Sequence, residues 1–271
     1  MDNANIHPTA IVQDGAKIGD GVVIGPNCFV GSGAEIGDNT KLSANVIVEK
    51  NVVMGKDNVV YPQAVIGCGP QIFGKPSDYK YGRLVIGDSN IIREQVTIHP
   101  GMFEGSSTEV GSRNFLMIGV HIGHDCVIED DIVTSNYSQI SGHCWLQRGV
   151  WFSGIVTVHQ FCTIGRWAYA TGLTGINHDI PPFMTASGHY PCVVRTVNRR
   201  GMARAGLSQE EQKSVTDIFK KVYREGGPIL EKVREMVGDE SLKDVQREII
   251  EFISRASEHR FGRYLETKRQ D

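Results

Sequence analysis

Residues 110–128 read VGSRNFLMIGVHIGHDCVI and place a branched or long apolar side chain at every sixth position. The same period continues in phase through most of the chain, at positions 18 to 66, 86 to 98 and 110 to 176. A short strand followed by a turn every six residues is the pattern of a hexapeptide β-helix, in which each coil stacks on the one before. The repeat therefore predicts a parallel β-solenoid.

Three hexads would complete one coil of triangular cross-section, so residues 18 apart should lie above one another at the strand spacing of about 4.8 Å. Cys126, Cys144 and Cys162 have this spacing and share one hexad position. We expect them to form an inward ladder of thiols rather than a metal site. The chain has six cysteines and no C-x-x-C pair, which favours reduced thiols.

Two segments interrupt the repeat, 68–84 and 100–109, where glycine, proline, serine and charged residues replace the apolar position. We expect loops there, either functional or tolerated insertions, because long loops on a rigid scaffold often carry function. From Ser208 the apolar period becomes helical, and Glu211 three residues later completes a capping box. The expected organisation is a β-helix domain over 1–198 and a small helical domain over 199–271.

Charge and hydropathy exclude several classes of protein. Lysine and arginine number 28 against 31 acidic residues, a net charge of -3, so nothing global favours nucleic acid as a partner. The first residues lack the features of a secretory signal, and no apolar run reaches the roughly 18 residues of a membrane span. We therefore expect a cytoplasmic protein without a membrane span.

The histidines are unevenly distributed. On the triangular grid His124, His143 and His159 fall on one face in consecutive coils, and His121 precedes them by one corner. Asp125 could orient the His124 imidazole and stabilise its protonated form, as a general base requires, if the backbone turns between the two residues. A metal site is the rival interpretation, because converging imidazoles bind zinc.

An isolated solenoid face is flat and wet, whereas packing against a second subunit would form a cleft. We therefore expect a cyclic trimer. A second cluster, VRTVNRRGMARAG at 194–206, holds four arginines that could fork onto phosphate oxygens or simply form a solvated linker.

The motifs HIGHDC (121–126), SGH (141–143), VHQFCTIG (158–165) and DIPPF (179–183), followed by a helical C-terminal region, together resemble the UDP-N-acetylglucosamine O-acyltransferases. The resemblance covers nearly the whole chain. It implies a homotrimer of left-handed parallel β-helices that performs the first step of lipid A biosynthesis. The implied reaction moves a 3-hydroxyacyl chain from the phosphopantetheine of acyl carrier protein to the 3-hydroxyl of UDP-N-acetylglucosamine, with no bound cofactor and no metal.

The resemblance also implies roles for individual residues. His124 is similar to the general base, Asp125 to its supporting carboxylate, and the Gly142 N–H to an oxyanion donor. The implied contacts to the sugar nucleotide are Asp78, Lys80, His121, His143, Gln160, Asn198 and Arg204. The implied lining of the acyl-donor groove is His159, Tyr169, Gly172 and His189.

Two departures from the family pattern bear on the substrate. The segment that the family writes QDLKY is SDYKY at 77–81, which keeps Asp78 and Lys80, and Arg200 and Ala205 replace an acidic residue and a second arginine. The acyl chain length and the choice between a hydroxyl and an amino acceptor at sugar carbon 3 stay open. Acyl-coenzyme A as donor and a carbonic anhydrase-like metal trimer are the alternatives.

Overall fold

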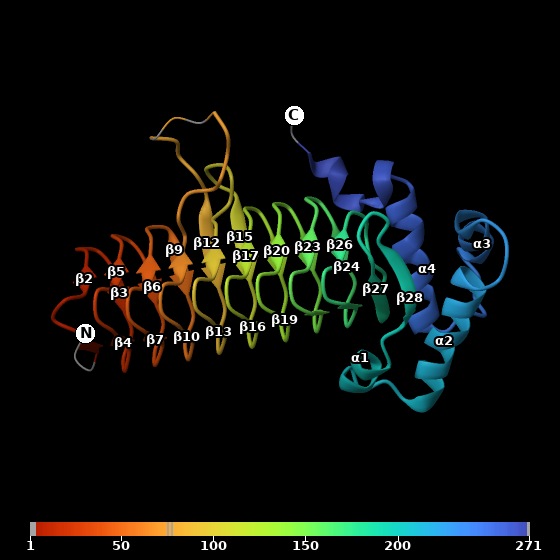
Figure 1. Ribbon diagram of the computed structural model, residues 1–271, viewed down its shortest axis with the longest axis horizontal. Helices are drawn as coiled ribbons and strands as arrows, with labels where there is room; N and C mark the ends of the chain where they lie inside the picture. The colour runs from red at the N-terminus through yellow and green to blue at the C-terminus, as the bar shows by residue number, and fades with distance from the viewer. Residues whose placement is uncertain (1–3, 75, 77, 270–271) are drawn as a thin grey trace.

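The structure is a computed structural model that describes residues 4–74, 76 and 78–269, and it consists of a parallel β-solenoid followed by helices (Figure 1). The expected fold class, a parallel β-helix with a helical C-terminal part, is confirmed. Along most of the solenoid each coil contributes one short strand to each of three sheets, here called A, B and C, so neighbouring strands are three apart in the chain. The C-terminal end of sheet A is the exception, where β25, β27 and β28 are neighbours.

The strands of the three sheets are as follows. Sheet A contains, in order, β1 (Asn5–Ile6), β4 (Val23–Ile24), β7 (Lys41–Leu42), β10 (Val59–Val60), β13 (Ile91–Ile92), β16 (Phe115–Leu116), β19 (Val133–Thr134), β22 (Trp151–Phe152), β25 (Tyr169–Ala170), β27 (Met184–Ser187) and β28 (Val193–Val197). Sheet B contains β2 (Ile11–Val12), β5 (Phe29–Val30), β8 (Ile47–Val48), β11 (Val65–Ile66), β14 (Thr97–Ile98), β17 (His121–Ile122), β20 (Gln139–Ile140), β23 (Thr157–Val158) and β26 (Gly175–Ile176). Sheet C contains β3 (Lys17–Ile18), β6 (Glu35–Ile36), β9 (Val52–Met54), β12 (Arg83–Ile86), β15 (Ser107–Val110), β18 (Val127–Ile128), β21 (Trp145–Leu146) and β24 (Thr163–Ile164).

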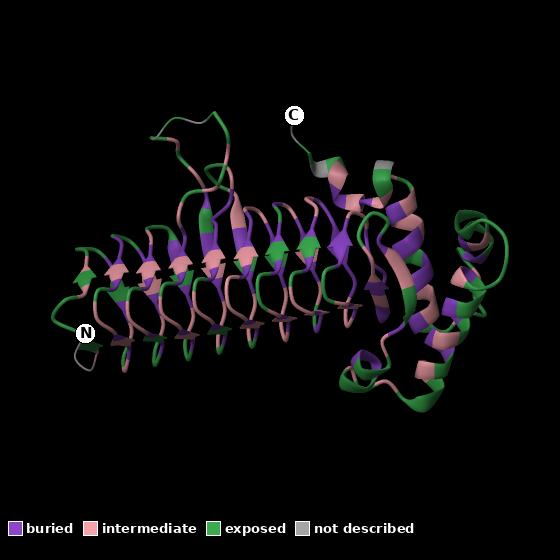
Figure 2. Cartoon of the chain, viewed as in Figure 1, coloured by how far each residue is buried: buried purple, intermediate pink, exposed green. Residues whose placement is uncertain are grey.

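The hexad repeat builds these coils because the last residue of each short strand points inward and the residue before it points out. Buried positions consequently recur in every coil along the solenoid (Figure 2). The cysteine ladder is confirmed, since Cys126, Cys144 and Cys162 are all buried and free. The coil corners use left-handed backbone at non-glycine residues, among them Asp125 and His143 with φ of 56° and 59°.

Both interruptions of the repeat leave the solenoid at the same corner, where sheet B passes to sheet C (Figure 1). The first follows β11 and the second follows β14. Both loops end earlier than expected, because β12 begins at Arg83 and β15 at Ser107 and the two strands pair from these residues onward. The backbone hydrogen bonds of that pairing extend the solenoid into the bases of both loops.

The helices cover the C-terminal end of the solenoid. They are α1 (Arg199–Arg204), α2 (Gln209–Tyr223), α3 (Ile229–Met236) and α4 (Asp244–Ser257), followed by the 3₁₀ helices η1 (Arg260–Gly262) and η2 (Tyr264–Lys268). The capping box of Ser208 and Glu211 is confirmed at the start of α2. β28 returns antiparallel to β27 and contacts α2, so it closes the edge of sheet A.

Among the residues described, no helix is both long enough and apolar enough to cross a membrane.

Candidate active site

The corner between sheets B and C gathers the histidines that the sequence placed on one face. We call it the histidine corner and define it by His99, His124, His143 and His159, which follow β14, β17, β20 and β23 in successive coils. His121 lies on β17 itself, on the outer face of sheet B beside this corner. The two long loops emerge at the same corner.

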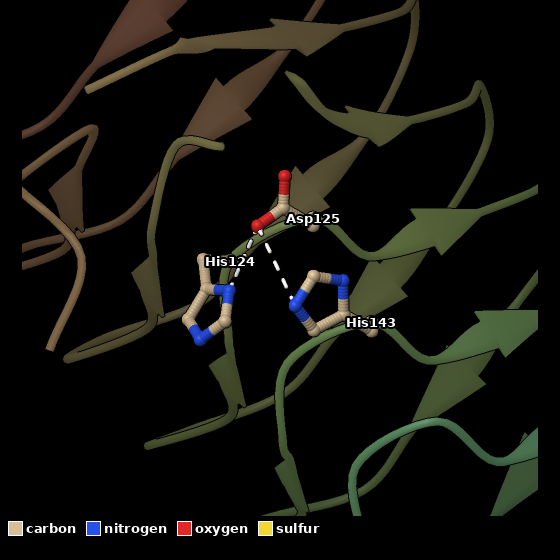
Figure 3. Close-up of side chains that lie close together, drawn as sticks. All are labelled: His124, Asp125 and His143. Carbon is tan, nitrogen blue, oxygen red and sulfur yellow. Dashed lines mark hydrogen bonds and ion pairs between the residues drawn. The ribbon is translucent and has the colours of Figure 1, made fainter. Parts of the chain in front are cut away.

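His124 and Asp125 form the closest pair at this corner. The backbone turns between them, as the general-base hypothesis requires, because Asp125 is in the left-handed region with φ 56°. The turn brings the carboxylate round to the imidazole, and His124 Nδ1 lies 2.8 Å from Asp125 Oδ2 (Figure 3). The Asp125 side chain is 13% exposed, so the pair is largely shielded from water.

The charge of Asp125 decides which nitrogen of His124 is free. Burial acts to raise the pKa of Asp125, but hydrogen bonds with His124, Ser106 and the Met102 backbone outweigh it and hold the pKa below its usual value. Asp125 is therefore ionised at neutral pH and can only accept hydrogen bonds. Since His124 Nδ1 must then donate to it, Nε2 carries the lone pair and can take a proton.

The 100–109 loop holds the carboxylate in place. The Met102 N–H donates to Asp125 Oδ2 over 2.9 Å, and the Asp125 N–H donates to the Thr108 hydroxyl over 2.8 Å. The loop therefore supplies a partner to the side chain of Asp125, and β15, the strand at the base of the loop, supplies one to its backbone. This is structural support for the functional interpretation of the loop.

Gly142 lies directly against the His124 ring. A Cβ atom at Gly142 would come within 2.7 Å of His124 Nε2 and 2.6 Å of its Cε1, so any side chain here would displace the imidazole. None of the described residues accepts a hydrogen bond from the Gly142 N–H. This backbone donor is therefore available beside the imidazole.

His143 completes the cluster from the next coil. Its ring stacks on Phe161 at a centroid distance of 4.6 Å and meets the His124 ring edge-on at 4.9 Å. His143 Nε2 lies 3.9 Å from Asp125 Oδ2, an electrostatic contact rather than a hydrogen bond (Figure 3). One ligand atom each from His124, Asp125 and His143 lie within 4.8 Å of one another, which is the arrangement that the metal hypothesis needs.

His121 is neutral at physiological pH. Burial, together with the neighbouring rings of His99 and His124, lowers the pKa of His121 to about 4. Its Nδ1 lies 2.9 Å from the Thr97 hydroxyl, and its ring lies 5.2 Å from that of His99. The unprotonated ring can therefore donate and accept hydrogen bonds without carrying charge.

His99 lies outside the column of histidines predicted from the hexad grid, although it directly precedes the second loop. His99 is buried, and its Nδ1 donates to the carbonyls of Cys68 and Gly69 at 2.9 and 3.0 Å, which fixes the base of the 68–84 loop. Its position between a hexad strand and the loop that begins at residue 100 could have indicated a role at this corner.

Four further expected residues, His159, Gln160, Asp78 and Lys80, lie at or near this corner. His159 follows β23 in the coil after His143, and its Nδ1 lies 3.1 Å from the Gln160 carbonyl. Asp78 and Lys80 are exposed on the 68–84 loop and line a pocket of about 300 Å³ with Tyr79 and with Glu104 of the second loop.

The remaining expected residues lie elsewhere on the protomer. Tyr169, Asn198 and Arg204 line a cavity of about 610 Å³ on sheet A, and sheet A is the side of the triangle opposite the histidine corner. Gly172 is at the corner between sheets A and B, and His189 contacts Gly175 on sheet B. A single protomer therefore does not unite the expected site residues.

Hydrogen bonding also defines local roles for two of these residues. Asn198 caps α1, because its side chain accepts from the Gly201 N–H at 3.0 Å and donates to the Trp167 carbonyl at 2.8 Å. The Arg204 guanidinium lies over the Trp151 ring, 4.2 Å from its centroid. The cavity they line thus combines aromatic faces with arginine charge.

A triangular hexad solenoid with a His–Asp pair at one corner is an architecture of the hexapeptide-repeat class of proteins. Comparison with known proteins identifies the transferases of that class. The family described as "Bacterial transferase hexapeptide (six repeats)" matches residues 1–32, and "Udp N-acetylglucosamine O-acyltransferase; Domain 2" matches residues 179–262. An acyl-[acyl-carrier-protein]–UDP-N-acetylglucosamine O-acyltransferase of Anaeromyxobacter sp. is 43% identical over 252 residues, 92% of this chain and 96% of that protein. The chain therefore belongs to the UDP-N-acetylglucosamine O-acyltransferase family.

Two other comparisons show how far the similarity extends. A relative of the same description from Synechocystis sp. is 38% identical over 181 residues, which is 66% of this chain and only 64% of that protein. The crystal structure of the Francisella novicida UDP-N-acetylglucosamine acyltransferase superposes with a TM-score of 0.83 at 33% identity, over 92% of this chain and 90% of that one. The similarity to that structure includes both the solenoid and the C-terminal helices.

Proposed function

We propose that this protein transfers a 3-hydroxyacyl chain from acyl carrier protein to the 3-hydroxyl of UDP-N-acetylglucosamine, with His124 as general base. The observation that carries the proposal is the 2.8 Å contact between His124 Nδ1 and the ionised Asp125, beside the unpaired Gly142 N–H. The names of the relatives support the substrates, because those proteins are described as acyl-[acyl-carrier-protein]–UDP-N-acetylglucosamine O-acyltransferases.

The proposed chemistry is a direct acyl transfer. His124 Nε2 takes the proton of the sugar hydroxyl as its oxygen attacks the thioester carbonyl, and Asp125 stabilises the imidazolium that forms. The Gly142 N–H donates to the developing oxyanion; one such donor typically contributes about 3 to 4 kcal/mol to the transition state. The tetrahedral intermediate then expels the pantetheine thiolate, which takes the proton back from His124, so the base is regenerated.

The two substrates would contact different groups of residues around His124. We assign His121, His143, Gln160, Asp78 and Lys80 to the sugar nucleotide, and His159 to the start of the acyl-donor groove. His121 suits this role because its low pKa of about 4 keeps it uncharged at the pH of the reaction.

A homotrimer would unite the residues that one protomer separates. The histidine corner and sheet A lie on opposite sides of the triangle, so threefold packing can bring one subunit's corner against the next subunit's sheet A. In that arrangement Asn198, Arg204 and Tyr169 of one subunit face the His124 centre of its neighbour. The cavity at Arg204 would then take the nucleotide diphosphate.

The proposal is tested by the mass of the product formed from UDP-N-acetylglucosamine with a panel of 3-hydroxyacyl donors. Each donor is offered both on acyl carrier protein and on coenzyme A, and a UDP-sugar with a 3-amino group is the second acceptor. We expect an O-acylated product from the carrier-protein donor. Preferential use of the coenzyme A donor would contradict the proposed donor. Acylation of the amino sugar alone would contradict the proposed acceptor.

The metal hypothesis remains a second candidate because His124, Asp125 and His143 can converge on one ion. Metal analysis of the purified protein separates the two. The acyl-transfer proposal predicts full turnover after treatment with a chelator, whereas a metal-dependent reaction would be lost and restored by zinc.

A further inference from the structure

Met102 connects the 68–84 loop to the carboxylate of the proposed active site. Its carbonyl accepts a hydrogen bond from the Tyr79 hydroxyl over 2.7 Å, and its N–H donates to Asp125 Oδ2 over 2.9 Å. The carbonyl of Met102 therefore bonds to the 68–84 loop, and its N–H bonds to the active-site carboxylate. Tyr79 lies between Asp78 and Lys80 in the sequence.

This contact is distinct from those that join the bases of the two loops. There, the Gly82 N–H donates to the Gly101 carbonyl over 2.9 Å, and the Gly101 N–H donates to the Arg83 carbonyl over 3.2 Å. Beyond the bases, Tyr79 and Glu104 come from different loops and line one pocket of about 300 Å³. The Tyr79 hydroxyl joins the loops at this pocket.

We propose that Tyr79 is a positioning residue that couples the substrate-binding loop to the Asp125–His124 pair through Met102. The coupling to substrate rests on the proposed function, in which Asp78 and Lys80 contact the sugar nucleotide. The bond to its carbonyl restricts rotation of the Met102 backbone and keeps the Met102 N–H directed at Asp125. Contact of Asp78 and Lys80 with the sugar nucleotide would then be transmitted through Tyr79 to the carboxylate.

The geometry around Asp125 shows why this hold matters. Oδ2 lies 2.8 Å from His124 Nδ1, within hydrogen-bond distance, and 3.9 Å from His143 Nε2, an electrostatic contact. The Met102 N–H donates to the same oxygen over 2.9 Å, and the Ser106 side chain also hydrogen-bonds the carboxylate. On this proposal, loss of the Met102 contact gives Oδ2 more freedom to move toward His143, so the orientation of the His124 ring is less firmly fixed.

The first test is amide hydrogen exchange of the 100–109 segment, which needs no substrate. Tyr79→Phe removes only the hydroxyl, and we expect the peptide containing Met102 to exchange faster by about 3- to 10-fold, the usual effect of losing one hydrogen bond. Tyr81→Phe is the matched control, because it makes the same change in the same loop and none of the described residues hydrogen-bonds the Tyr81 hydroxyl. Equal exchange in the two variants would overturn the proposal even if the protein proved to catalyse another reaction.

The second test is a double-mutant cycle in the acyl-transfer assay. We expect Tyr79→Phe to lower kcat by about 3- to 10-fold with little change in KM for the sugar nucleotide. In an Asp125→Ala background the same substitution should have no further effect, because the carboxylate through which it acts is gone. An additive loss would mean that Tyr79 supports the loop without acting on Asp125.

Discussion

At the scale of single residues, the site depends on one carboxylate with three kinds of partner. Asp125 accepts from His124 and from the Met102 N–H, and it lies near His143. The sequence could place His124 and Asp125 side by side but could not show that their side chains meet. That contact depends on the left-handed backbone at Asp125, a conformation that aspartate adopts more readily than most residues.

His121 gives a prediction about pH and stability. Its pKa is about 4 in the folded protein against about 6.5 in an unfolded chain, so between these values only the unfolded chain binds the proton. The contribution of His121 to stability is therefore complete above pH 6.5 and is lost as the pH falls toward 4. We expect the unfolding temperature of wild type to fall between pH 7 and pH 4.5 by more than that of His121→Asn. Parallel curves for the two proteins would show that His121 is not the half-buried neutral group described here.

At the scale of elements, the sequence predicted the strands and the places of the two loops, but not the contacts that the loops make. Strands such as β17 and β20 follow from the hexad period, because every apolar residue in phase must point inward. The period disappears in the loops, so no pattern indicates that Tyr79 meets Met102 or that Met102 meets Asp125. The strands β12 and β15 extend into the expected loops because they pair with each other, a long-range contact that local sequence does not reveal.

The corner after β25 gives a prediction about acyl chain length. A Cβ at Gly172 would lie 3.5 Å from the Gly154 carbonyl and 3.9 Å from Ser153 Cβ, both ordinary van der Waals contacts, so a side chain can begin here without displacing the coil. If this corner ends the acyl groove, Gly172→Met should shift the preference to shorter donors, because each excluded methylene loses about 0.8 kcal/mol of burial. The measurement is kcat/KM across 3-hydroxyacyl donors of increasing length. An unchanged preference with an unchanged unfolding temperature would place the end of the groove elsewhere.

At the scale of the whole molecule, the arrangement of the expected residues supports assembly. The sequence could not show that Arg204 and His124 lie on opposite sides of the triangle. Arg204 comes after the last hexad, so the repeat does not predict which face of the solenoid it lies beside. Nor could it indicate that Asn198 caps α1 through its own side chain. The three sheets explain why the proposed site needs two subunits, which periodicity alone did not require.

Shared sites between subunits predict complementation. Suppose that His124 and Arg204 of one site come from two neighbouring subunits. In trimers assembled at random from equal amounts of His124→Ala and Arg204→Glu subunits, roughly a quarter of the sites should then have both residues intact. Each variant alone is expected to be nearly inactive. Recovery of about that fraction of wild-type activity after mixing by unfolding and refolding supports shared sites. No recovery, with trimers verified by light scattering, would mean that each subunit contains its whole site.

Turnover in variants of the HIGHDC segment tests whether His124 is the general base. The reaction is acyl transfer from 3-hydroxyacyl carrier protein to UDP-N-acetylglucosamine, followed by product mass over a range of sugar-nucleotide concentrations up to saturation. We expect His124→Ala to lower kcat by about 10²- to 10⁴-fold, the range for a positioned acid-base group. Asp125→Asn should fall between His124→Ala and wild type, and His121→Ala should affect KM more than kcat. Near wild-type kcat in a folded His124→Ala protein would contradict the account and move the base to His143 or His159.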